Sequence, residues 1–148
     1  GEKAIHQVLP LSGGNIDTAL SLLSEEGGDA DVQAFVEAAL SLTNDAAAVA
    51  VSTRLKDARD RSDRLLDALE RAIHQTLLVK TGMLTTDSLS EFPAPWRQIC
   101  ADITPSSLNT MLEAIFQARR LRHAQVNWQS TVDQLMIKLL EEQTIWQQ

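Results

Sequence analysis

Apolar residues recur at intervals of three and four along most of this chain, and that spacing strongly limits the folds available to it. The longest row consists of Leu65, Leu66, Leu69, Ile73 and Leu77. Such a row lies on one face of an α-helix, where it can pack into a core. The runs that would have to be strands lack the alternation of apolar and polar residues typical of a half-buried strand. The sequence therefore predicts an all-α fold.

Turn and capping residues divide the whole chain into about six or seven helices. The expected helices run from Asn15 to the Gly27–Gly28 pair, from Asp29 to Leu42, from Ala46 into the charged stretch Lys56–Arg64, along the leucine row to Gly82, over Trp96–Ala101, from Thr104–Pro105, and from Asn127. Thr104–Pro105 is a strong start signal, because an N-cap residue precedes a proline at the first helical position. Asn127 is the expected cap of the last helix.

Composition narrows the classes of function. The 148 residues, 44% of them hydrophobic, suffice for one core or for one core with a small appendage. A net charge of −7 and a pI near 4.8 argue against broad contact with DNA phosphates. The single cysteine suits a reducing compartment, and no apolar stretch is long enough for a membrane span, so we expect a cytoplasmic protein. We interpret Gly1–Lys3 as the cut end of a longer protein.

No residue pattern indicates catalysis. His6, His74 and His123 lack partners at metal-ligand spacing, and Cys100 has no nearby histidine, so a packed core thiol is the favoured interpretation. Ser12–Gly14 is not followed by the Lys-Ser/Thr pair of a phosphate-binding loop. The sequence therefore predicts no catalytic residue, no cofactor and no metal site.

The best candidates for a binding surface are Arg119, Arg122, Trp128 and Trp146. Arg119 and Arg122 continue the apolar row of their helix. The favoured interpretation is that these cations stabilise the last turn of that helix, where carbonyl groups are unpaired. The alternative is that they lie on a surface shared with another subunit, where a guanidinium can contact a carboxylate through two bonds. Each tryptophan is similarly either a core residue or an interface anchor.

Three stretches of the chain resemble a known family in their order and spacing. They are Leu11–Leu20, Leu69–Gly82, and Ala124–Asn127 with the helix that follows. The family is the delta-prime and gamma/tau subunits of the bacterial DNA polymerase III clamp loader, and the resemblance is to their C-terminal part. The first stretch is similar to the Gly-Ser-x-Arg-x-Ala-Leu motif at the end of the family's AAA+ lid. Asp17 stands where the arginine of ATP-binding members senses the γ-phosphate. This difference favours a delta-prime-like member.

The other two stretches match the family in different degrees. His74–Gln75 stand where relatives often carry an Arg-Asp pair, so the ion pair expected there is lost. Asn127, Leu135 and Leu139 match the register of the family's closing helix.

The resemblance implies that residues 1–26 end an AAA+ lid and that residues 29–148 form the helical collar, a compact bundle of about five or six helices. In this family, five such domains close a collar that carries the ATPase modules, which open the sliding clamp for loading onto primed DNA. The implied role is a non-catalytic assembly domain of the DNA polymerase III holoenzyme, a nucleotidyltransferase complex. Its direct partners would be the other clamp-loader subunits, with the clamp and DNA reached only through the parent complex.

Two alternatives stay open. A gamma/tau-type ATPase subunit would carry an intact Gly-x-x-x-x-Gly-Lys-Ser/Thr loop upstream, whereas a degenerate loop would favour delta-prime. A helical interaction or ligand-binding module unrelated to replication would be indicated by a sizeable enclosed apolar cavity with convergent polar groups.

Overall fold

The computed structural model describes residues 30–124 and 127–147. Within them the fold is all-α, with 83% helix and no strand, which confirms the predicted fold class. The chain divides into two units, Gly1–Ala34 and Phe35–Gln148. The predicted lid segment, residues 1–26, and Asp17 lie outside the described residues and stay predictions.

The described part of the second unit contains five α-helices, residues 35–39 of a further helix over residues 30–39, and three short 3₁₀ turns. The elements are α3 (Asp45–Ala58), η1 (Arg59–Arg61), α4 (Ser62–Lys80), η2 (Thr86–Leu89), α5 (Ala94–Cys100), α6 (Pro105–His123), α7 (Trp128–Thr144) and η3 (Ile145–Gln147). None of the helices in the described ranges is both long and apolar enough to span a lipid bilayer.

Two predicted helix starts are confirmed. The Thr104 hydroxyl accepts a hydrogen bond of 3.1 Å from the backbone N–H of Ser107 at the start of α6. The Asn127 side chain accepts one of 3.1 Å from the N–H of Ser130 at the start of α7. Each bond satisfies one of the N–H groups that a helix leaves unpaired at its N-terminus.

The junction between α3 and α4 carries no glycine or proline, and the sequence did not predict a sharp break there. Arg59 adopts φ 52° and ψ −109°, a conformation that favours glycine. Its carbonyl accepts hydrogen bonds from Ser62 Oγ at 2.8 Å and from Arg122 Nη2 at 2.9 Å. These two bonds hold the strained turn that redirects the chain into α4.

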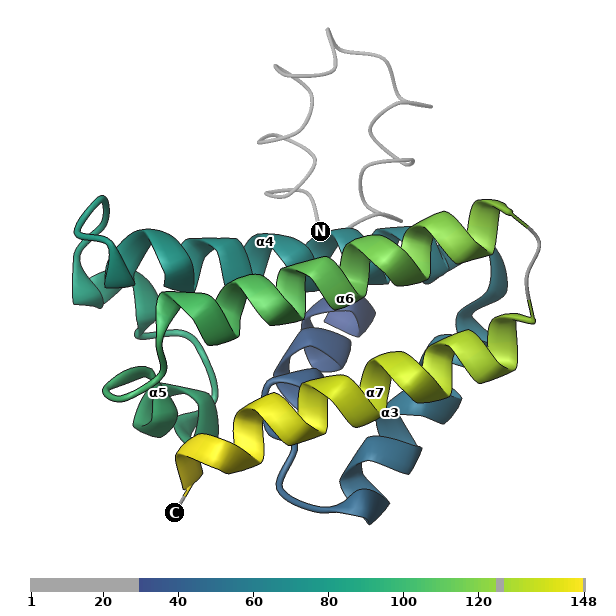
Figure 1. Cartoon of the computed structure of the whole chain (residues 1–148), viewed down its shortest axis with the longest axis horizontal. Helices are drawn as coiled ribbons and strands as arrows, with labels where there is room; N and C mark the ends of the chain where they lie inside the picture. The colour runs from purple at the N-terminus through teal and green to yellow at the C-terminus, as the bar shows by residue number, and fades with distance from the viewer. Residues whose placement is uncertain (1–29, 125–126, 148) are drawn as a thin grey trace, which may run out of the picture. The chain divides into compact units, whose positions relative to one another are not determined.

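Helix α6 lies between α4 and α7, runs antiparallel to both, and packs against each of them, while α7 also packs on α3 (Figure 1). The predicted apolar rows face the interior of this arrangement. Its largest fully buried side chains are Phe35, Leu40, Leu42, Leu55, Leu66, Leu69, Ile73, Trp96, Ile103, Leu108, Met111 and Ile115. Aliphatic residues thus provide most of the packing, as the low aromatic content of 4% requires.

A buried glutamine joins α7 to the turn that follows the helix over residues 30–39. Gln143 is only 1% exposed. Its amide nitrogen donates to the carbonyl of Ala39 at 2.7 Å, and its amide oxygen accepts from the N–H of Leu42 at 3.2 Å. These two bonds satisfy backbone groups at a helix end that would otherwise be buried without partners.

Candidate protein-interaction site

The arginines predicted at an interface lie along the line where α6 meets α4 of the same chain. Arg119 Nη1 lies 3.0 Å from Glu70 Oε2 and 3.8 Å from Asp67 Oδ1. Arg122 donates to the carbonyl of Arg59, and its Nε lies 4.0 Å from Asp63 Oδ1. The acidic residues of the first half of α4 therefore meet the basic end of α6. This explains how charge can continue an apolar row.

The side chains of both arginines remain partly exposed to solvent. The side chains of Arg119 and Arg122 are 29% and 25% exposed. Each guanidinium is thus anchored within its own chain while one edge still faces outward. Contact of that edge with a neighbouring subunit remains a prediction.

Both candidate tryptophans also make contacts within the chain. The guanidinium of Arg122 lies over the Trp128 ring, 4.8 Å from its centroid, within the range of a cation–π interaction. Trp146 donates from Nε1 to Ser107 Oγ at 3.1 Å, and that hydroxyl donates to Glu142 Oε1 at 2.7 Å. Both rings are half-buried, so core packing and a role at an interface remain compatible.

His74 and Gln75, which the sequence resemblance compares with an Arg-Asp pair, differ in their surroundings. Gln75 donates from Nε2 to the carbonyl of Ser88 at 2.7 Å, and so ties α4 to the turn η2. His74 is exposed. The described contact at these two positions is therefore a neutral hydrogen bond from Gln75 across the short loop after α4.

Phe116 and Arg120 make a surface feature that the sequence did not predict. Phe116 is 58% exposed, and the guanidinium of Arg120 lies 6.0 Å from its ring centroid. One helical turn separates them, so they share a face of α6. No clear sequence signal pointed to this, because Phe116 follows Leu112 by four residues and so lies at the edge of the apolar row. Aromatic residues and arginine are both enriched at protein interfaces, so this pair is a candidate contact point.

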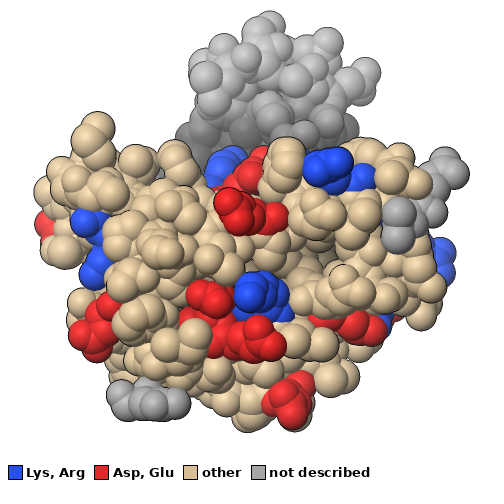
Figure 2. All heavy atoms as spheres, in the orientation of Figure 1, with Lys and Arg blue, Asp and Glu red and all other residues tan. Residues whose placement is uncertain are grey.

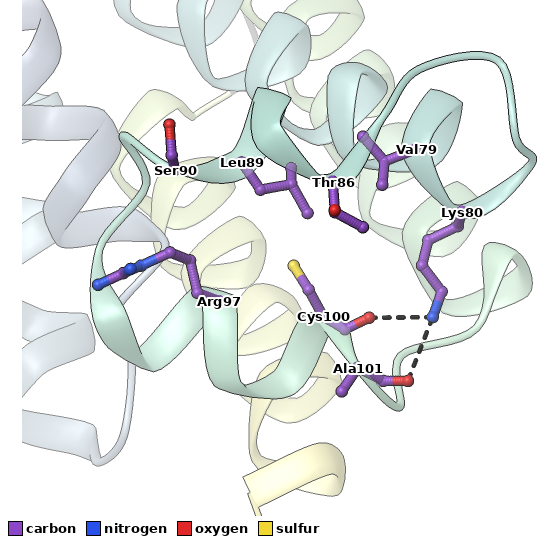
Figure 3. Close-up of a pocket in the computed structure, with 8 residues that line it drawn as sticks. All are labelled: Val79, Lys80, Thr86, Leu89, Ser90, Arg97, Cys100 and Ala101. Carbon is purple, nitrogen blue, oxygen red and sulfur yellow. Dashed lines mark hydrogen bonds between the residues drawn. The ribbon is translucent and has the colours of Figure 1, made fainter.

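A hollow of about 590 Å³ at the end of α4 has a structural explanation (Figure 3). It is lined by Val79, Lys80, Thr86, Leu89, Ser90, Arg97, Cys100 and Ala101. The Lys80 ammonium donates to the carbonyls of Cys100 at 2.9 Å and Ala101 at 3.4 Å, where it satisfies the C-terminal end of α5.

Cys100 is buried, with its sulfur pointing into this hollow (Figure 3). Burial raises the pKa of its thiol to about 11, and the positive charge of Lys80 offsets only part of that rise. The thiol is therefore protonated near neutral pH and is a poor nucleophile.

The charged groups suit contact with protein rather than with a polyanion. Acidic and basic side chains are interspersed over the face shown in Figure 2. Within the described ranges, no group of three His, Cys, Asp or Glu side chains is placed to hold a metal ion. The surface features most suited to binding are therefore the arginines and aromatic rings of α6 and α7.

Comparison of the chain with protein-family models, with curated proteins and with solved structures found no match.

Proposed function

We propose that this chain is a non-catalytic assembly module, the collar domain of a delta-prime-type clamp-loader subunit of bacterial DNA polymerase III. Its role would be to hold subunits together while the sliding clamp is loaded onto primed DNA during replication. In this proposal the direct partners are the collar domains of the other clamp-loader subunits, and the parent protein works in the cytoplasm.

The observation that carries the proposal is the placement of the residues on which the family resemblance depends. Asn127 caps α7, and Leu135 and Leu139 are 3% and 1% exposed on the side of that helix that faces the core. The family register thus coincides with a cap and two core positions of a helix pair that closes an all-α bundle. These are the structural roles that the family pattern requires of its closing helix, and the order and spacing of all three matched stretches support the proposal.

The surface of the bundle supports contact with protein. The side chains suited to recognition are arginines and aromatic rings, which are enriched at the energetic centres of protein interfaces. The net charge of −7 and the mixed charges of Figure 2 favour contact with DNA only through other subunits.

Asp17 favours delta-prime over gamma/tau within this proposal. An aspartate at the position of the sensor arginine would repel the γ-phosphate instead of attracting it. If the subunit is of gamma/tau type, the protein that contains this chain will bind ATP tightly and carry an intact phosphate-binding loop upstream. Tight ATP binding would therefore show that the delta-prime assignment is wrong, but it would not contradict the proposed assembly role.

The experiment is reconstitution with the other clamp-loader subunits encoded in the same genome. The purified chain, shown to be folded by its helical circular dichroism spectrum, is mixed with each subunit at micromolar concentration. The mixtures are then analysed by size-exclusion chromatography with light scattering. We expect a stoichiometric complex with at least one subunit and none with an unrelated acidic helical protein of similar size. A folded chain that binds none of the subunits would refute the proposal.

A further inference from the structure

The outer face of α6 carries an open hollow of about 540 Å³ beside the line where α6 meets α4. We call it the α6 hollow, and its lining residues are Glu70, Phe116, Arg119, Arg120, His123 and Ala124. The side chain of Phe116, a residue that is 58% exposed, forms an apolar wall of this hollow. Isolated exposed apolar residues need no explanation, but one that lines a hollow among arginines is a candidate anchor point.

The two arginines of the hollow differ in their partners. Arg119 is already matched, because its guanidinium lies 3.0 Å from the Glu70 carboxylate. Arg120 is exposed, has no acidic partner within 4.0 Å among the described residues, and lies 6.0 Å from the centre of the Phe116 ring. The hollow therefore presents one arginine, Arg120, that pairs with no carboxylate of the described residues, next to the apolar side chain of Phe116.

The acidic groups around the hollow restrict which anion can enter. Glu70 lines the hollow and is 36% exposed, and Asp67 lies 3.8 Å from the guanidinium of Arg119. A polyanion such as nucleic acid would bring several phosphates close to these carboxylates and be repelled. A single carboxylate brings only one negative charge into the hollow, and Arg119 already pairs with Glu70 there.

We propose that the α6 hollow receives an acidic and apolar helical segment of a neighbouring clamp-loader subunit, with a carboxylate on Arg120 and an apolar side chain against Phe116. This inference rests on the proposed function and adds the chemistry of the partner. Phe116 and Arg120 are four residues apart on α6 and so lie on one face. A partner helix with an apolar residue and an Asp or Glu three or four positions apart would present the matching pair, and a guanidinium can bind a carboxylate through two bonds.

The experiment compares variants of the intact chain for binding to the subunit with which the wild type forms a complex. Arg120→Glu reverses the unmatched charge, and Phe116→Ser removes the apolar wall. Arg54→Glu and Val49→Ser are the matched controls, because both residues are exposed on α3, which does not line the hollow. Dissociation constants are measured by isothermal titration calorimetry at low and high salt, and circular dichroism checks that each variant is folded.

We expect Arg120→Glu and Phe116→Ser each to weaken the complex about ten-fold or more, and the two controls to change it less than about two-fold. Added salt should weaken the wild-type complex more than the Arg120→Glu complex, because that variant lacks the interfacial ion pair. If the wild type binds and the two hollow variants bind equally well, the inference is wrong while the proposed function stands. If the wild type binds no subunit, both are wrong.

A cross-linking experiment tests the identity of the occupant directly. The photoreactive residue p-benzoylphenylalanine, placed at position 116, should cross-link to a subunit segment that carries an Asp or Glu within four residues of the attached apolar side chain. The same residue at position 49 is the control and should not give that adduct. A cross-link from position 116 to a second copy of this chain, or to a segment without acidic residues, would overturn the assignment.

Discussion

The indole Nε1 of Trp96 donates a hydrogen bond of 3.0 Å to Oγ1 of Thr76, and both side chains are completely buried. The Thr76 hydroxyl donates in turn to the carbonyl of Ala72 at 3.0 Å. One hydroxyl therefore satisfies the only side-chain donor of the tryptophan and joins α5 to the C-terminal part of α4. The bond positions the largest side chain of the core.

Replacement of Thr76 by valine should lower the free energy of unfolding by about 1–3 kcal/mol, because the shape is conserved while the buried indole N–H loses its acceptor. Urea denaturation followed by tryptophan fluorescence measures the change. Thr76→Ser keeps the hydroxyl and should keep most of the bond's contribution. Thr53→Val, at an exposed position of α3, is the control and should change stability by less than about 0.5 kcal/mol. Equal effects of the variants at positions 76 and 53 would contradict the assigned role of the bond.

Gln143→Leu should destabilise the bundle by about 2–4 kcal/mol, because it leaves the carbonyl of Ala39 and the N–H of Leu42 without their partners. The loss should arise from the polar groups, since leucine fills a similar volume. Thermal unfolding by circular dichroism gives the size of the change. Gln134→Leu, on the exposed side of α7, is the matched variant and should leave stability within about 0.5 kcal/mol of the wild type. A stable Gln143→Leu protein would show that these backbone groups find other partners.

Asp133 should make stability depend on pH in the acidic range. Hydrogen bonds from Lys56 Nζ at 2.8 Å and Ser52 Oγ at 2.7 Å hold the pKa of this carboxyl below its ordinary value near 3.9. The unfolded chain then binds a proton more readily than the native state does. The stabilisation is therefore present above about pH 4 and is lost as the pH falls through the native pKa.

Comparison of the wild type with Asp133→Asn tests this dependence. The difference in their free energies of unfolding should be largest near neutral pH and should shrink below about pH 4. A titration of the Asp133 carboxyl carbon by NMR should give a pKa below the ordinary value, and Ser52→Ala should raise it part of the way back. A difference that stays constant from pH 6 to pH 3 would show that the two hydrogen bonds do not favour the charged form.

Arg59→Gly should stabilise the protein by about 1 kcal/mol. An arginine with φ 52° and ψ −109° is strained, and relief of that strain should exceed the entropy that glycine adds to the unfolded chain. The hydrogen bonds accepted by the backbone carbonyl of residue 59 do not depend on its side chain. Arg54→Gly, within α3, should have the opposite effect and cost about 1 kcal/mol. Destabilisation by both variants, measured as lower urea midpoints, would refute the assigned strain.

Local sequence signals predicted the features of this fold that depend on neighbouring residues. The starts of α6 and α7 follow from Thr104–Pro105 and Asn127, because a cap and the N–H group it satisfies lie within one helical turn. The break at Arg59 carries no glycine or proline signal, and one of the two hydrogen bonds to its carbonyl comes from Arg122, which is distant in the sequence. From the sequence alone, Gln143 would be expected at the surface. Only the fold shows that it bonds to backbone groups at the end of a distant helix.

In the candidate site, too, the sequence predicted the features that depend on neighbouring residues and not those that depend on contacts distant in the sequence. The continuation of the apolar row predicted that Arg119 and Arg122 would lie on one face of their helix, but only the fold identifies α4 as the element that they meet. The exposed pair of Phe116 and Arg120 depends on how α6 is oriented between its two neighbours. The spacing of apolar residues does not fix the rotation of α6 about its own axis closely enough to decide which residues at the edge of its apolar face are exposed.

The central position of α6 has a consequence for how the bundle opens. Because α6 packs on α4 with one side and on α7 with the other, its release would expose two apolar surfaces at once, so few partial openings can free it. Amide protons in the middle of α6 should therefore exchange with solvent at a rate close to that of global unfolding. The ends of α3 and α5 can unfold locally without separating α6 from α4 and α7, so their amide protons should exchange sooner. A subunit that docks on α6 would thus contact the most rigid element of the domain.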